Sequence, residues 1–173
     1  SDMKKIVYSI LAVAAISMAS CAKEEPGMTA TEPLAGQWYV TFDAVDNDGK
    51  LVEADPHQKG RVLTATFNTS ANSANQMWVS DLNNFWEYQA KVNCDVNTLT
   101  FSSVDWVDNY TYDCKVKITD GKMLKGAAKT PSGMPADSIV YYVQFSDDED
   151  IEAGNWAKYR VSGYRYTGFV ADE

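Results

Sequence analysis

Short segments in which apolar and polar side chains alternate run through most of this chain. The first, residues 37–45, places four apolar side chains on one face, namely Trp38, Val40, Phe42 and Ala44. Because successive side chains of a β-strand point to opposite faces, the alternation predicts strands that pack one face against a core and expose the other to water. Asp, Asn, Gly and Pro interrupt the pattern about every ten residues, as turns do. The sequence therefore predicts an all-β fold.

The pattern predicts nine strands, and the connections predict how they pair. The expected strands are residues 37–45, 61–69, 76–80, 85–94, 98–104, 110–119, 123–129, 139–146 and 158–169. Three connections, 46–49, 95–97 and 119–122, have the Asp, Asn and Gly composition of hairpin turns, so sequential strands are expected to be antiparallel neighbours. We expect an eight- to nine-stranded antiparallel up-and-down barrel, because closure leaves no strand edge exposed. A two-layer sandwich is the alternative.

The N-terminal segment has the composition of an export signal. Lys4 and Lys5 precede an apolar run at residues 6–18. This run is shorter than the about 20 residues of a membrane-spanning helix, so we expect it to be cleaved. Cys21 follows Met18-Ala19-Ser20, which resembles the lipobox of bacterial lipoproteins, and the resemblance implies a lipid on Cys21. An ordinary signal peptide that contains a cysteine is the alternative.

Three regions are expected along the chain. Residues 1–20 hold the signal peptide, preceded by Ser1 and Asp2, which we expect to be a cloning remnant. Residues 21–33 hold the lipidated cysteine and a flexible tether, and residues 34–173 form one barrel domain. The formal net charge of −9 argues against a nucleic-acid partner, since phosphates attract basic patches. We expect a monomer held at a membrane by the lipid on Cys21.

Cys94 and Cys114 are too few for a disulfide scaffold. Both fall in the apolar phase of expected strands that lie two apart in a meander. That separation, about 9 to 10 Å, exceeds the reach of about 7 Å between bridged Cα atoms. We therefore expect two buried thiols, with one disulfide as the alternative because an exported protein meets an oxidising compartment.

The sequence contains no recognisable catalytic or metal-binding motif. His57, the one histidine, lies beside Pro56 in a polar loop and is expected to be solvated. A serine hydrolase needs a base, most often histidine, and no Gly-x-Ser-x-Gly motif occurs. We expect no catalytic site, with Asp105 and Asp108 as the carboxylate pair to inspect for glycoside cleavage. The acidic run 147–150 is expected to be a solvated loop, with weak calcium binding as the alternative, and no cofactor or metal is expected.

Several strings resemble known families. Gly36-Gln37-Trp38-Tyr39 resembles the Gly-x-Trp-Tyr element of lipocalins, in which the tryptophan closes the barrel floor under a late basic residue; Arg160 and Arg165 are the candidates. Longer strings, including 36–46, 130–139 and 161–169, resemble the gut-bacterial lipoprotein family named "lipid-binding putative hydrolase". This resemblance implies a lipocalin-like barrel. The segment 21–25 also resembles the acidic signal that places such lipoproteins on the outer face of the outer membrane.

Aromatic residues provide the remaining functional signal, with five Trp, ten Tyr and six Phe. We expect the barrel interior to hold a small hydrophobic ligand, such as a lipid or fatty acid, without catalysis. The expected ligand-binding residues are Phe42, Phe67, Trp86, Tyr88, Phe101, Tyr112, Val116, Met134, Tyr141 and Val143. The ligand is expected to enter beside the long connections 54–60 and 130–138, with Met134 at the mouth.

The alternative is a surface module whose barrel is filled by its own rings. Its aromatic residues outside the core would then contact a protein or a glycan, and the candidates are Tyr39, Trp78, Trp106, Trp156 and Tyr166. The volume left inside the barrel separates the two hypotheses.

Overall fold

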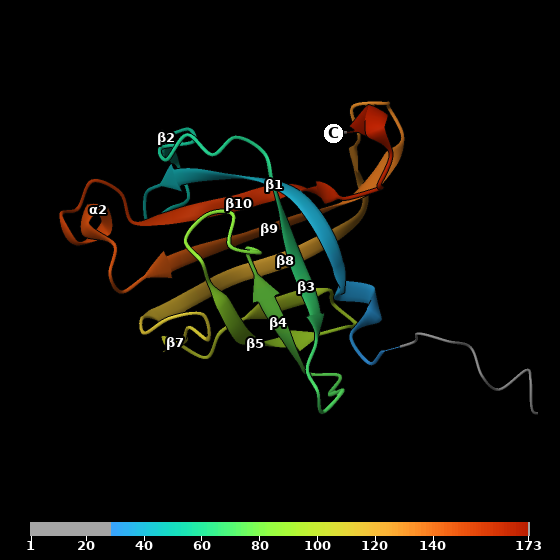
Figure 1. The fold of residues 1–173 in the computed structure, drawn as a ribbon, viewed down its shortest axis with the longest axis horizontal. Helices are drawn as coiled ribbons and strands as arrows, with labels where there is room; N and C mark the ends of the chain where they lie inside the picture. The colour runs from blue at the N-terminus through green and yellow to red at the C-terminus, as the bar shows by residue number, and fades with distance from the viewer. Residues whose placement is uncertain (1–28, 173) are drawn as a thin grey trace, which may run out of the picture.

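The computed structural model describes residues 29–172, which form an antiparallel β-barrel (Figure 1). The strands are β1 (Gly36–Val45), β2 (Leu51–Glu53), β3 (Val62–Asn68), β4 (Gln76–Ser80), β5 (Gln89–Asp95), β6 (Thr100–Ser102), β7 (Val107–Asp108), β8 (Lys115–Lys129), β9 (Pro135–Phe145) and β10 (Lys158–Arg165). Short helical turns are η1 (Glu32–Leu34), α2 (Glu149–Glu152) and η2 (Val170–Asp172). Within these residues, no helix has the length and apolar character needed to cross a membrane.

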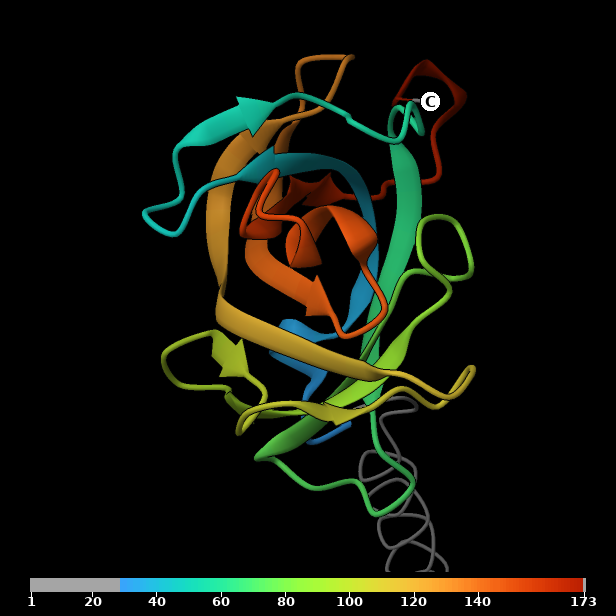
Figure 2. The ribbon, with the colours of Figure 1, turned by 90° about the vertical axis from the view of Figure 1, so that its left-hand side faces the viewer.

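Eight strands close the barrel. Neighbours follow the order β1, β3, β4, β5, β6, β8, β9 and β10, and β10 returns to pair with β1. Every pairing is antiparallel, while β2 and β7 are short additions beside β1 and β8. Figure 2 looks onto one end of this barrel, with the connection between β9 and β10 lying across the opening. The predicted all-β barrel is confirmed.

One predicted hairpin is wrong. Residues 119–122 do not reverse the chain, because β8 runs through them from Lys115 to Lys129. The register against β9 shifts between Thr119 and Lys122, which is a β-bulge. Asp120 has φ of 50° there, and a side chain at Gly121 would overlap the Phe101 ring. The Asp-Gly pair thus serves a bulge, which needs the same backbone freedom as a turn.

Four predicted strands are also shorter than expected. The strand predicted at 98–104 is reduced to Thr100–Ser102, the one predicted at 158–169 ends at Arg165, and two others begin later. Residues 85–88 and 110–114 are loops, so β5 begins at Gln89 and β8 at Lys115. Both loops lie at one end of the barrel, where they contribute to the site described below.

Aromatic rings fill much of the barrel interior. The largest fully buried side chains are Trp38, Tyr88, Tyr141, Tyr159, Phe42, Phe145, Leu34 and Met77. Cys94 and Cys114 are buried and unbridged, in agreement with the prediction of two thiols. The interior is therefore a packed aromatic core over much of its volume.

The floor of the barrel is closed at the end where η1 enters β1. Trp38 is fully buried and donates its indole hydrogen to Thr66 Oγ1 at 3.0 Å. Thr66 in turn donates to the Leu34 carbonyl at 2.5 Å. The Arg165 guanidinium lies 4.4 Å from the centre of the Trp38 ring, whereas Arg160 faces Asp43 at 3.8 Å. Of the two candidates, Arg165 is the basic residue over the floor tryptophan.

Candidate functional site at the His57 end of the barrel

The end of the barrel opposite Trp38 is covered by loops. They are residues 46–50 and 54–61 on either side of β2, 81–88 between β4 and β5, 109–114 between β7 and β8, and 146–157 between β9 and β10. In Figure 1, β2 and α2 mark this end, and η1 marks the other. We call it the His57 end, and we call residues 54–60 the His57 loop.

A buried carboxylate shapes the 81–88 loop. The Asp81 side chain is fully buried, and its two oxygens accept hydrogen bonds at 2.7 to 3.2 Å from five backbone amides of the same loop, those of Asn83, Phe85, Trp86, Glu87 and Tyr88. Because these amides are satisfied by Asp81, they do not take part in a strand ladder. Asp81 therefore ends β4 and sets the path of residues 85–88 across the barrel end.

This path places two loop rings on two core rings. Phe85 stacks on Phe42 with centroids 3.9 Å apart, and Trp86 stacks on Phe145 at 4.8 Å, each pair within 7° of parallel. Trp86 also donates its indole hydrogen to Asp147 Oδ1 at 3.0 Å. The 81–88 loop thus covers the core with aromatic faces that point toward the end of the barrel.

His57 lies half-buried against these rings, although the sequence predicted a solvated residue. Its ring centre is 5.4 Å from Phe85, 5.6 Å from Trp86 and Tyr159, and 6.3 Å from Trp156. We call Phe85, Trp86, Trp156 and Tyr159 the aromatic box. The prediction failed because all four rings come from other loops and strands, far from His57 in the sequence.

A chain of hydrogen bonds fixes His57 in the box. Tyr159 donates its hydroxyl hydrogen to Asp148 Oδ2 at 2.5 Å, and the same hydroxyl lies 2.9 Å from His57 Nε2. Because Tyr159 has one hydroxyl hydrogen, its oxygen accepts from His57 Nε2. Burial, followed by the hydrogen bond to Asp148, raises the pKa of Tyr159 well above its ordinary range. Tyr159 is thus held protonated, and it links the His57 loop to the barrel.

The other candidate reactive groups have structural partners. A serine hydrolase would pair its histidine with a serine, but among the described residues the hydrogen-bond partner of His57 is Tyr159. Asp105 pairs with Lys117 at 3.5 Å, and Asp108 pairs with Lys115. No cluster of three or more His, Cys, Asp or Glu side chains in residues 29–172 has metal-site geometry.

The structure brings together seven of the ten residues predicted to bind ligand. Six belong to the buried core, namely Phe42, Tyr88, Phe101, Val116, Tyr141 and Val143, and Trp86 packs against that core. The hydroxyls of Tyr88 and Tyr141 lie 2.5 Å apart inside it, and burial raises the pKa of both groups. These two hydroxyls satisfy each other rather than facing an open space.

The remaining three predicted residues lie elsewhere. Phe67 follows the inward-facing Thr66 and pairs with Trp78, which places its half-buried ring on the outer face. Tyr112 is 37% exposed and donates to Asp147 at 2.6 Å at the His57 end. Met134 is 56% exposed in the turn between β8 and β9, at the Trp38 end. Cys21 lies outside the described residues.

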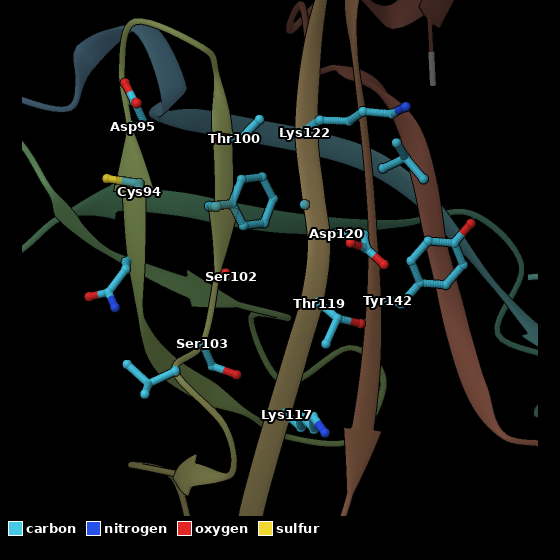
Figure 3. Close-up of a pocket in the computed structure, with 15 residues that line it drawn as sticks. Cys94, Asp95, Thr100, Ser102, Ser103, Lys117, Thr119, Asp120, Lys122 and Tyr142 are labelled. Carbon is cyan, nitrogen blue, oxygen red and sulfur yellow. The ribbon is translucent and has the colours of Figure 1, made fainter. Parts of the chain in front are cut away.

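A hollow of about 1010 Å³ lies on the outside of the barrel wall (Figure 3). Side chains from β5, β6, β8 and β9 line it, and it opens to solvent. It holds charges of both signs, from Lys117 and Lys122 and from Asp95 and Asp120. Because it is open to solvent and carries these charges, the groove differs from an enclosed apolar ligand cavity.

Sequence reasoning missed the residues that build the His57 end. Asp81 carried a local signal, because an aspartate followed by Asn83 and Asn84 is typical of a side-chain-capped turn. Asp148, Tyr159 and the association of His57 with the box carried none, since their partners are distant in sequence.

Residues 23–170 match the protein family described as "Lipid-binding putative hydrolase". The chain belongs to this family. The match covers nearly all of the described barrel, and the family resemblance expected from the sequence is confirmed. No curated protein matches the chain. A β-barrel of the lipid-binding family fits a lipid-binding role.

Proposed function

We propose that this protein binds a hydrophobic, lipid-like molecule at the His57 end of its barrel, where the ligand takes the place of the His57 loop. The observation that carries the proposal is the aromatic box: half-buried rings of Trp86 and Trp156 and buried rings of Phe85 and Tyr159 meet beneath a loop rather than beneath a strand. Because the core below is packed with rings, the ligand seat lies at this end and not deep in the barrel. Membership of the lipid-binding family supports the proposal.

The loops at this end are held in costly backbone conformations. Asp55 and Gln58 in the His57 loop, and Leu82, Asn83 and Glu87 in the 81–88 loop, have φ between 45° and 66°. Such positions cost about 1–3 kcal/mol each for residues other than glycine. When the His57 loop opens, release of this strain offsets part of the free energy needed to uncover the rings.

A short acyl chain supplies more free energy than the two hydrogen bonds that tie down the His57 loop. The His57 loop is tied to the barrel by the hydrogen bond between His57 and Tyr159 and by the bond from the Asp55 amide to Asp43 at 3.0 Å. Each bond contributes about 1 kcal/mol, whereas each buried methylene contributes about 0.8 kcal/mol. Burial of about five methylenes over the box therefore contributes about 4 kcal/mol, which exceeds the contribution of the two hydrogen bonds, about 2 kcal/mol. Leu51, Val52 and Leu82, which are 51%, 49% and 41% exposed at the same end, extend the apolar surface.

The tether is part of the same proposal. We propose that Cys21 carries a lipid and holds the protein at the outer membrane, facing the cell surface, as a monomer. The sequence of the N-terminal segment supports this. Because η1 enters the barrel at the Trp38 end, the His57 end is the one remote from the tether. Incorporation of labelled palmitate that is lost in Cys21→Ala would support the anchor, and unchanged incorporation would refute it.

Binding of an uncharged fluorescent fatty alcohol tests the proposed ligand site. The wild-type protein should bind it saturably with one site per chain. His57→Ala removes the imidazole and its hydrogen bond, so association should be about five- to tenfold faster. Gln58→Ala, in the same loop but exposed, is the matched control and should behave as wild type. Absence of saturable binding in both wild type and His57→Ala would refute the proposal.

The alternative, a surface module with a filled barrel, has one observation in its favour. Outside the barrel, Trp78 and Tyr110 pack edge to face at 4.7 Å, and Tyr110 and the 41%-exposed Trp106 line a groove of about 340 Å³. Exposed rings of this kind suit a glycan or protein partner. Glycan binding that is lost in Trp106→Ala, together with no uptake of the fatty alcohol, would favour this alternative.

A further inference from the structure

The aromatic box has the dimensions of a site for an organic cation. The centre of the His57 ring lies 5.4 Å from the Phe85 ring and 5.6 Å from the rings of Trp86 and Tyr159. A cation within about 6 Å of a ring centre is attracted by the negative face of the ring. The planes of Phe85, Trp86 and Tyr159 stand at 40° to 76° to one another. A charge at the place of the imidazole would therefore meet several rings of different orientation.

Carboxylates behind the box strengthen its attraction for positive charge. Trp86 donates to Asp147 and Tyr159 donates to Asp148. A ring whose polar hydrogen is bonded to a carboxylate is polarised toward greater electron density. The β9–β10 loop that supplies both carboxylates also carries Glu149 and Asp150, so the field at this end is negative.

Lys158, the first residue of β10, does not neutralise this field within the box. Lys158 lies 4.6 Å from the centre of the Tyr142 ring and donates to the Asn47 carbonyl, on the outer side of the barrel. His57 is the basic side chain that contacts the box rings, and it comes from the loop that the ligand is proposed to displace. The protein thus fills its own box with one of its own basic side chains.

From this geometry we propose that the His57 end selects amphiphiles with a cationic headgroup, a quaternary ammonium or an amine, which occupies the position of the His57 imidazole. This inference rests on the proposed function and specifies the ligand class of that same site. The rings of Trp86 and Tyr159 bind the headgroup, Asp147 and Asp148 supply the compensating charge, and the alkyl chain covers the apolar surface at the barrel end.

Three amphiphiles with the same decyl chain separate the two proposals. Decyltrimethylammonium, decanol and decanoate are titrated into the full protein below their micellar concentrations, and tryptophan fluorescence and calorimetry report binding. Decyltrimethylammonium should bind at least tenfold more tightly than decanol, and decanoate more weakly than either. If all three bind within threefold of one another, or if decanoate binds most tightly, the headgroup inference is overturned and the proposed hydrophobic site stands. If none binds, both are overturned.

Variants of the box test the assignment to these residues. Trp86→Leu keeps an apolar side chain but removes the ring face, so the preference for decyltrimethylammonium over decanol should fall to threefold or less while decanol binding persists. Trp106→Leu, which changes an exposed tryptophan outside the box, is the matched control and should keep the full preference. An unchanged preference in Trp86→Leu overturns the inference.

His57→Ala provides a second test that does not depend on Trp86→Leu folding well. Removing the imidazole leaves the box open, so tetramethylammonium alone should quench tryptophan fluorescence saturably in His57→Ala and at least fivefold more weakly in the wild type. Equal responses in the two proteins, or none in either, would show that the imidazole position is not a cation site.

Discussion

Replacing Asp81 with asparagine tests whether one carboxylate builds the His57 end. Oδ2 of Asp81 accepts three backbone hydrogen bonds and Oδ1 accepts two, and the carboxylate itself is fully buried. In Asp81→Asn one of these oxygens becomes an amide NH₂ group, which donates rather than accepts. At least two backbone N–H groups that face the buried carboxylate then lose their acceptor, at about 1–3 kcal/mol each. We expect a loss of about 2–6 kcal/mol, a large share of the 5–15 kcal/mol typical of a domain.

Urea unfolding followed by circular dichroism and by tryptophan emission measures this loss. The midpoint should fall while the slope m remains unchanged, because the surface exposed on unfolding is the same. Asp95→Asn is the matched control, since Asp95 caps the exposed turn between β5 and β6 through the amides of Asn97 and Thr98. Its expected cost is below about 1 kcal/mol, as for most surface changes. Equal costs for the two variants would refute the role assigned to Asp81.

Three further predictions concern the floor, the barrel wall and the C-terminus. Arg165→Met should lower the free energy of unfolding by about 2 kcal/mol, because the contact with Trp38 and the hydrogen bonds of Arg165 are lost. Arg160→Met should lower it by less than about 1 kcal/mol. Equal shifts in melting temperature for the two variants would contradict the floor assignment. Gly163→Ala would place a Cβ against the Tyr39 carbonyl, so urea unfolding should show a free energy of unfolding lower by about 3 kcal/mol or more. An unchanged free energy of unfolding would show that β1 and β10 are not packed so closely. Hydrogen bonds from Thr167, and then Ser132, lower the pKa of Asp172 from 3.8 to about 2. The ionised carboxylate therefore stabilises the fold above pH 3.8, and this stabilisation is lost as the pH falls toward 2. The melting temperature of Asp172→Asn should therefore lie furthest below that of the wild type near neutral pH and approach it in acid. A difference in melting temperature that is constant with pH would contradict this prediction.

The barrel and its floor were predictable because their signals are local and periodic. Alternation in residues 37–45 identified the inward face of β1, and the buried Trp38 lies on it. Arg165 was one of two candidates for the residue over Trp38, and only its place in the register of β10 against β1 distinguishes it from Arg160. The bulge at Asp120 was not predictable, because Asp-Gly suits both a hairpin turn and a bulge.

The His57 end was not predictable from the sequence, because it is assembled from distant segments. His57 and Tyr159 are 102 positions apart, so the polar composition around His57 indicated only a solvated loop. Period-two alternation extended through residues 85–88 and suggested a strand, but the five hydrogen bonds to Asp81 outweigh that preference locally. Site prediction failed where loop hydrogen bonding, rather than strand periodicity, determines the structure.

Amide hydrogen exchange with and without a bound decyl-chain amphiphile tests the central claim most directly. Binding should change exchange in the His57 loop and in residues 81–88, because the ligand displaces the first and covers the rings of the second. Exchange in the 130–134 turn at the Trp38 end should stay unchanged. Protection confined to that turn or to the outer groove of Figure 3, or binding with no change at the His57 end, would contradict the account.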